Sequence, residues 1–173
     1  MAISLYAATV PSYLQILDAM SKLIDKAQTH CSEKSIDPNL LLQARLAEDM
    51  QPFVYQIKSV VVHSLGAIEG ARKGVFSPDM SPAPQTFDAL RTRVTQAMAA
   101  LNATAASEVD GLVGRDMRFV YGEHQMAYTA EDFLLSFSVP NFYFHATTAY
   151  DILRWKGLPI GKRDYLGRPR IKP

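Results

Sequence analysis

Hydrophobic positions recur every three or four residues over several long segments of this chain, which is the spacing of an amphipathic helix. The pattern predicts four long helices and one short one. The long helices are expected from Thr9 to about Cys31, from Asp49 to about Arg72, from Thr86 to Ala105 and from Thr129 to Lys156, and the short one over 39–47. Asp49, Thr86 and Thr129 are candidate N-caps for the last three long helices.

The segments between these helices carry different signals. The proline-rich stretch FSPDMSPAPQ, residues 76–85, has no periodicity and predicts a linker that crosses to the next helix. Short alternating pieces at Met117–Tyr121 and Gln125–Tyr128, joined across Gly122, predict a small hairpin. Pro140 lies inside the last predicted helix and is expected to kink it about one turn before His145.

The resulting fold prediction is an all-α four-helix bundle that forms a single domain over residues 1–173. The small hairpin is an excursion from this bundle. The tail GLPIGKRDYLGRPRIKP holds too many glycines and prolines for a helix, so we expect an irregular C-terminal arm that packs through its interleaved apolar side chains. In such bundles, ligand sites are built from side chains that project inward.

Composition narrows the class of protein. The chain has 173 residues, of which 48% are hydrophobic and 20% are charged, and this suits a single folded domain. Its apolar stretches are too short to cross a bilayer, and its N-terminus lacks the basic segment of a signal peptide, so we expect a cytoplasmic protein. One cysteine, Cys31, excludes an internal disulfide. The common hydrolase, nucleotide-binding and zinc-protease motifs are missing.

Charge is unevenly distributed, because residues 154–173 carry seven basic side chains and one acidic side chain. Lys162 and Arg163 are therefore candidate anion ligands, although pairing with acids on the helical body or on a dimer partner is the commoner role. The rest of the chain offers no basic face studded with aromatic side chains. Nucleic acid is thus the least favoured partner.

Two histidines are candidate site residues because of where their helices place them. His145 lies in FYFHATTAY and shares part of the apolar stripe of the last helix, whereas His63 lies on the flank of the second long helix. The two side chains could converge across the bundle and bind a divalent metal, with His124 from the hairpin as a third ligand. Histidines that only hydrogen-bond within the core are the commoner alternative. For His30, a favourable interaction with the dipole at its helix end is a sufficient explanation.

Carboxylates are weaker candidates. Glu48, Asp49 and Glu69 could act as metal ligands or bases, but helix capping or surface solvation is the favoured role of each.

Four segments give the chain a resemblance to a known family. They are ISLY at 3–6, LLQARLAEDMQPFVYQI at 41–57, TFDALRTRV at 86–94 and PNFYFHATTAYDILRWKGLPIGKRDYLG at 140–167. With these segments the chain resembles an uncharacterised bacterial and fungal family, a domain of unknown function, within the DinB-like (YfiT-like) superfamily of proposed metalloenzymes. The resemblance implies an up-down-down-up helix order and a tendency to form homodimers.

The resemblance also implies a metal site, which this chain matches only in part. Superfamily members hold nickel, zinc or a similar ion through one histidine of the second helix and an H-x-x-x-H pair of the last. His63 and His145 match two of these ligands, whereas Asn141 and Ala149 stand four residues to either side of His145. The resemblance therefore implies a degraded or variant site.

Two functions compete, and the resemblance implies the first of them. The first is a divalent-metal-dependent enzyme of the thiol-dependent transferase or isomerase type, in which Asn141, Tyr143 or Tyr150 orients the substrate. Lys162 and Arg163 would then hold an acidic thiol cofactor. The second is a non-catalytic, dimeric small-molecule-binding or stress-related protein that needs no metal.

Overall fold

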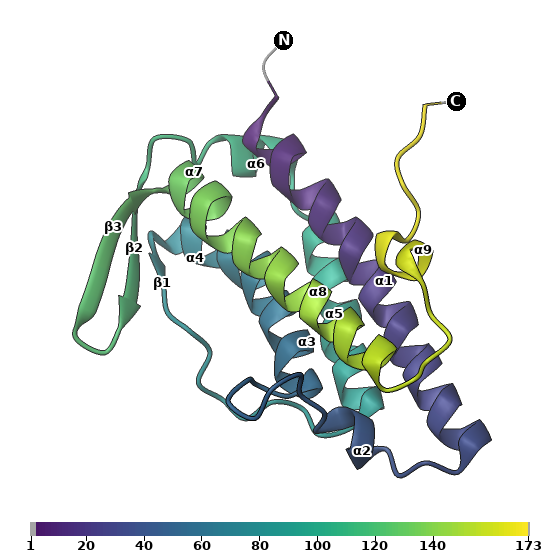
Figure 1. Ribbon diagram of the computed structural model, residues 1–173. Helices are drawn as coiled ribbons and strands as arrows, with labels where there is room; N and C mark the ends of the chain where they lie inside the picture. The colour runs from purple at the N-terminus through teal and green to yellow at the C-terminus, as the bar shows by residue number, and fades with distance from the viewer. Residues whose placement is uncertain (1–2, 173) are drawn as a thin grey trace.

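A computed structural model describes residues 3–172 as a mostly helical molecule with a small sheet at one end (Figure 1). The helices are α1 (Leu5–Lys34), α2 (Asn39–Leu42), α3 (Phe53–Val61), η1 (Val62–Gly66), α4 (Ala67–Lys73), α5 (Phe87–Asn102), α6 (Ala106–Asp110), α7 (Ala130–Asp132), η2 (Phe133–Ser138), α8 (Val139–Trp155) and α9 (Lys162–Leu166). The strands are β1 (Val75–Phe76), β2 (Asp116–Tyr121) and β3 (His124–Thr129). Within the described residues, no helix is both long enough and apolar enough to span a membrane.

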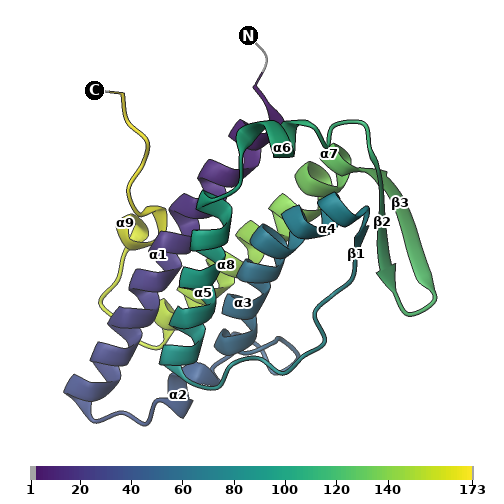
Figure 2. The ribbon, with the colours of Figure 1, turned by 180° about the vertical axis from the view of Figure 1, so that it is seen from behind.

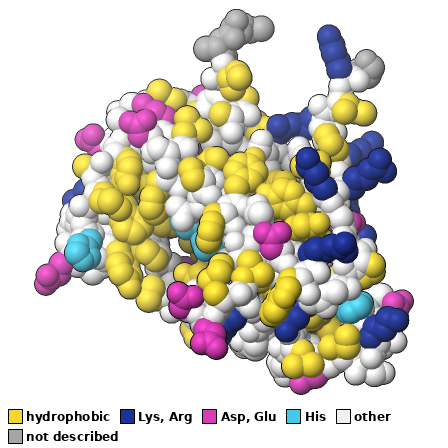
Figure 3. Space-filling view, viewed as in Figure 1, with side chains coloured by type: hydrophobic (Ala, Val, Ile, Leu, Met, Phe, Trp, Pro, Cys, Tyr) yellow, Lys and Arg dark blue, Asp and Glu magenta, His cyan; other side chains and the backbone are white. Residues whose placement is uncertain are grey.

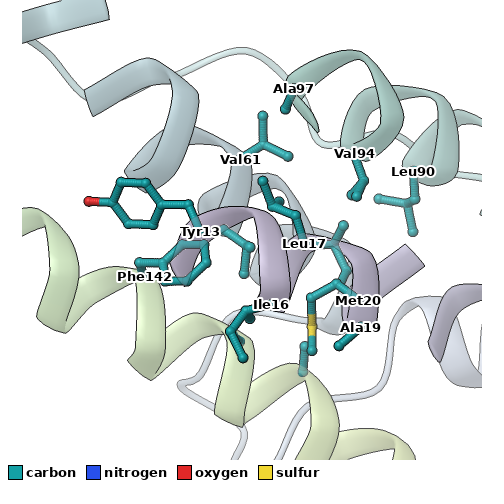
Figure 4. Close-up of a cluster of buried hydrophobic side chains, with 14 of the residues drawn as sticks. Tyr13, Ile16, Leu17, Ala19, Met20, Val61, Leu90, Val94, Ala97 and Phe142 are labelled. Atoms are coloured by element: carbon teal, nitrogen blue, oxygen red, sulfur yellow. The ribbon is translucent and has the colours of Figure 1, made fainter. Parts of the chain in front are cut away.

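The long helices pack side by side around one apolar core. Helix α1 lies against α5, and α3 lies against α8 (Figure 2). The periodic positions identified in the sequence fill the space between them: Leu17, Met20, Leu90 and Val94 are fully buried (Figure 4). Burial of these side chains supplies the main driving force for packing the amphipathic faces together.

Two of the three predicted N-caps are confirmed and one is wrong. Thr86 Oγ1 accepts a hydrogen bond from the backbone N–H of Ala89 at 3.1 Å, and Thr129 caps α7 in the same way. Asp49 does not cap the second long helix, which instead begins at Phe53 after the extended residue Pro52. The first helix also starts earlier than predicted, because Ser4 caps α1.

The second and the last long helices each contain a π-helical segment, which the periodicity did not predict. Segment η1 separates α3 from α4, and η2 leads directly into α8. Pro140, which has no N–H to donate, is the second residue of α8 and so follows η2 immediately. The predicted irregularity at Pro140 therefore takes the form of a widened helical turn before it.

The all-α prediction needs correction, because the molecule has a three-stranded sheet in the order β1-β2-β3. The predicted hairpin is confirmed as β2 and β3, whose antiparallel register pairs Phe119 with Met126. Strand β1 was not predicted: it pairs in parallel with β2 through Val75 and Phe76, at the start of the proline-rich linker. A two-residue strand gives no detectable alternation in the sequence.

Two shorter segments also differ from expectation. The helix predicted over 39–47 ends at Leu42, and the arm predicted to be irregular contains the short helix α9. The arm packs as expected, because α9 lies on α1 and Lys26 Nζ pairs with Asp164 Oδ1 at 2.5 Å. Leu158 and Ile160 anchor the start of the arm in the core.

Candidate functional site

His63 and His145 come together between two helices. His63 belongs to η1 and His145 to the middle of α8, and their ring centroids lie 5.7 Å apart with the ring planes inclined by 16°. The structure thus brings together the two histidines that the sequence placed on facing helices. π-Helical turns often occur at functional sites, and both π-segments of the described chain border this pair.

A buried glutamine determines which nitrogen of His145 carries hydrogen. His145 Nδ1 lies 2.7 Å from Gln56 Oε1, and Gln56 Nε2 donates to the backbone oxygen of Gln51 at 2.8 Å. Because the amide nitrogen of Gln56 is used by that carbonyl, its oxygen must face His145 and accept a hydrogen bond. Nδ1 of His145 therefore carries the hydrogen, and its Nε2 keeps a free lone pair.

A serine holds His63 by the same logic. Ser138 Oγ donates to the backbone oxygen of His63 at 3.0 Å, which leaves its lone pairs to accept. His63 Nδ1 lies 3.4 Å from that Oγ and is the donor of this longer contact. Nε2 of His63 is then also left with a lone pair.

Both imidazoles are neutral at physiological pH. Burial and, as a smaller contribution, the neighbouring His145 together lower the pKa of His63 to about 4. Burial alone lowers the pKa of His145 to about 4. The pair therefore acts as hydrogen-bond acceptors or bases rather than as cations.

The histidines line a cavity of about 180 Å³. Three phenylalanines from different elements form its aromatic wall: Phe76, Phe119 and Phe137. Asn141 also lines it and uses its amide Nδ2 to donate to the backbone oxygen of Phe137 at 2.7 Å. On the face shown in Figure 3, a histidine side chain is visible in a small hollow among hydrophobic side chains.

The strap, residues 77–82 of the proline-rich linker, covers one side of this cavity through Pro78 and Asp79. Lys58, whose side chain is only 3% exposed, fixes it in place. Lys58 Nζ donates to the backbone oxygens of Asp79 and Ser81, and lies 3.4 Å from Asp79 Oδ1. The charge of Asp79 is further balanced by Arg93 Nη2 at 2.6 Å.

The other residues predicted for the site lie elsewhere, apart from Asn141. Exposed His124 stands at the start of the hairpin strand β3, outside the cavity wall. Tyr143 is exposed on α8, and Tyr150 packs against the α9 residue Tyr165. Lys162 and Arg163 are exposed on α9, on the α1 side of the molecule (Figure 1).

The candidate carboxylates are also outside this cavity. Glu48 and Asp49 are exposed in the turn before α3. Glu69 lines a larger groove of about 650 Å³ beside α5, together with Lys73 and Arg93. We assign the site to the smaller cavity, because convergent polar atoms and perturbed pKa values indicate function better than size does.

Sequence reasoning missed Gln56 and Ser138, which contact the histidines, and Lys58, which holds the strap. Each is buried and polar within an otherwise apolar helical segment. A polar residue on the apolar face of a predicted helix could have indicated these positions. Buried polar side chains almost always have a hydrogen-bond partner.

The two histidines are fewer ligands than a zinc centre usually has. No group of three or more His, Cys, Asp or Glu side chains within residues 3–172 is arranged to hold a metal ion. Metal sites in proteins use three or four protein ligands, so two imidazoles alone would bind a divalent ion weakly.

Comparison with solved structures identifies the class of fold. A crystal structure of a DinB family member protein from Shewanella denitrificans matches with a TM-score of 0.81 and 25% identity, covering 98% of this chain and 95% of that chain. The molecule therefore has a DinB-like fold. The family model for DUF1993, a domain of unknown function, matches residues 5–166, and the chain belongs to this family. None of the curated proteins that were compared matches it.

Proposed function

We propose that this DUF1993 protein binds a small molecule in the cavity around His63 and His145 without a resident metal. The observation that carries the proposal is the hydrogen bond of 2.7 Å between His145 and Gln56, which leaves Nε2 of a neutral imidazole available to a ligand. This nitrogen is not among the buried unpaired atoms of the described residues, so a ligand or water that enters the cavity can reach it and donate a hydrogen bond to it.

A second candidate is the divalent-metal-dependent enzyme of the thiol-dependent transferase or isomerase type that the family resemblance implies. One observation favours it: both histidines have Nδ1 held by a polar partner, as is usual for metal-binding histidines. Nickel or zinc is the ion to test. The up-down-down-up helix order, homodimer formation and a cytoplasmic location stay predictions of the same resemblance.

One experiment separates the two candidates. Untagged, ¹⁵N-labelled protein is stripped of metal, checked by elemental analysis and titrated with phenol, toluene, benzoate and benzylammonium, while the imidazole ¹⁵N signals of His63 and His145 are recorded. We expect at least one probe to shift both sets of signals in metal-free protein. His124→Ala is the matched control, because it removes a histidine outside the cavity.

Two other outcomes would count against metal-free binding. The binding proposal is wrong if none of the four probes shifts the two sets of signals in metal-free protein. Near-stoichiometric metal in gently purified protein, lost in both His63→Ala and His145→Ala, would instead support the metal-dependent enzyme.

A further inference from the structure

The polar atoms left free in the histidine cavity are mainly acceptors. The Nδ1 positions of both histidines are engaged, so each presents its Nε2 lone pair. Asn141 Nδ2 donates a hydrogen bond to the backbone oxygen of Phe137, and no partner of Asn141 Oδ1 is found among residues 3–172. A ligand that pairs with these atoms has to bring O–H or N–H donors.

Charge in the cavity favours a neutral ligand. Lys58, the cation in its wall, already uses its ammonium group on two strap carbonyls and the Asp79 carboxylate. An anionic ligand would therefore find no free cationic partner. A cationic ligand would meet the ammonium of Lys58, and the Asp79 carboxylate that also lines the cavity is already paired with Lys58 and Arg93.

The aromatic wall and the volume favour one flat ring. The ring centroids of Phe119 and Phe137 lie 5.0 Å apart, and that of Phe76 lies 6.2 Å from Phe119. Aromatic walls bind flat rings through stacked or edge-to-face contacts. An apolar cavity of about 150 Å³ is known to hold benzene. The cavity here, about 180 Å³, thus has room for a ring with a small polar substituent.

We infer that the ligand of this cavity belongs to the class of small, neutral, single-ring molecules that carry one or two O–H or N–H donors. Phenol and catechol are the simplest probes of the class. The inference rests on the proposed function, since it names the chemistry of the molecule that the same cavity would take.

The test compares matched probes by dissociation constant. Phenol and toluene share one ring and differ in a donor, whereas benzoate and benzylammonium add a negative or a positive charge. We expect phenol to bind about fivefold more tightly than toluene for one hydrogen bond gained, and catechol more tightly again. Benzoate and benzylammonium should bind more weakly than phenol.

Variants locate the hydrogen bond. In whichever of His63→Ala and His145→Ala removes the acceptor that phenol uses, the ratio of the toluene to the phenol dissociation constant should fall to about one, because both probes lose the same apolar contacts and only phenol loses an acceptor. If His145→Ala is unfolded, His145→Leu replaces it in this measurement, because leucine fills the space with an apolar side chain. His124→Ala should keep the wild-type ratio.

Failure of this inference differs from failure of the proposed function. Tighter binding of benzoate, benzylammonium or toluene than of phenol would overturn the ligand class and leave a binding cavity. An unchanged ratio in both His63→Ala and His145→Ala would also overturn it. If none of the probes binds, catechol included, both the ligand class and the proposed binding function are overturned.

Discussion

Gln56 Oε1 and His145 Nδ1 lie 2.7 Å apart, although 89 residues separate them in sequence. This contact determines the tautomer of His145 and aims its free lone pair at the cavity. A buried side chain of α3 thereby controls the chemistry that α8 presents to a ligand.

Replacing Gln56 by glutamate should raise the pKa of His145 from its value of about 4. The carboxylate would accept the same hydrogen bond and add a negative charge, which favours the protonated imidazole. The measurement is a pH titration of the His145 ring signals by NMR. The control is Gln125→Glu, an exposed substitution in the hairpin. An equal pKa of His145 in Gln56→Glu and in the wild type would contradict the hydrogen bond between Gln56 and His145.

Acid should destabilise the protein before its carboxylates titrate. The pKa values of His63 and His145 are about 4 in the folded protein, against 6.5 for an unperturbed histidine. Between these values the unfolded state binds more protons, so stability is full above about pH 6.5 and falls as the pH approaches 4. The protonation of each histidine accounts for a loss of up to about 3 kcal/mol in the free energy of unfolding.

Urea unfolding at a series of pH values measures this loss. The slope between pH 4 and 6.5 should decrease in His63→Ala and in His145→Ala, because each variant removes one of the groups that titrate. His124→Ala should keep the wild-type slope. A flat profile in the wild-type protein would show that the two rings are not desolvated.

The fold was predictable from sequence to the extent that it depends on local patterns. Hydrophobic periodicity located the long helices, and the alternation around Gly122 located the hairpin. The π-segment that carries His63 has no such signature in the pattern, and it lies where the chain packs against α5 and α8. Local propensity is a weak guide where tertiary contacts decide the backbone.

The site was predictable only in part. His63 and His145 could be placed on facing helices, but their tautomers depend on contacts with Gln56 and Ser138 that span 89 and 75 residues. Tyr143, Tyr150, Lys162 and Arg163 were chosen by proximity in sequence to His145 or by charge, and none of them lines the cavity. Sequence spacing along one helix does not reveal which side chains a neighbouring helix covers.

Replacing Lys58 by methionine should loosen the strap. Methionine keeps most of the buried volume but leaves the carbonyls of Asp79 and Ser81 without their donor, and removes the buried partner of the Asp79 carboxylate. Leaving the carbonyls without their donor should cost about 1–3 kcal/mol, whereas the Asp79 carboxylate is 29% exposed and keeps Arg93 as its partner. Hydrogen exchange of residues 77–82 should accelerate, and the melting temperature should fall.

An exposed ion pair provides the control for Lys58. Lys22 pairs with Asp18 on the surface of α1, and its side chain is 61% exposed. Lys22→Met should change stability by less than about 1 kcal/mol, because exposed pairs are screened by solvent. Equal effects of the two substitutions would mean that Lys58 does not hold the strap.

Tyr13 carries a hydroxyl that is buried in the core beside α8. Its ring packs edge-on against Phe142 with centroids 4.7 Å apart, and the hydroxyl points away from Leu17 and Met20 (Figure 4). No hydrogen-bond partner of this hydroxyl is found in the described part of the chain, and burial raises its pKa. Burying an unpaired hydroxyl costs about 1–3 kcal/mol.

Tyr13→Phe should therefore leave the stability unchanged or raise it by about 1 kcal/mol, because phenylalanine keeps the ring and removes the unpaired group. Denaturant unfolding measures the difference. The matched comparison is Ser138→Ala, which removes a hydroxyl that does bond, to the backbone of His63, and should lower stability by about 1 kcal/mol. If Tyr13→Phe were as damaging as Ser138→Ala, the Tyr13 hydroxyl would have to be paired in solution, with Ser138 or with a bound water.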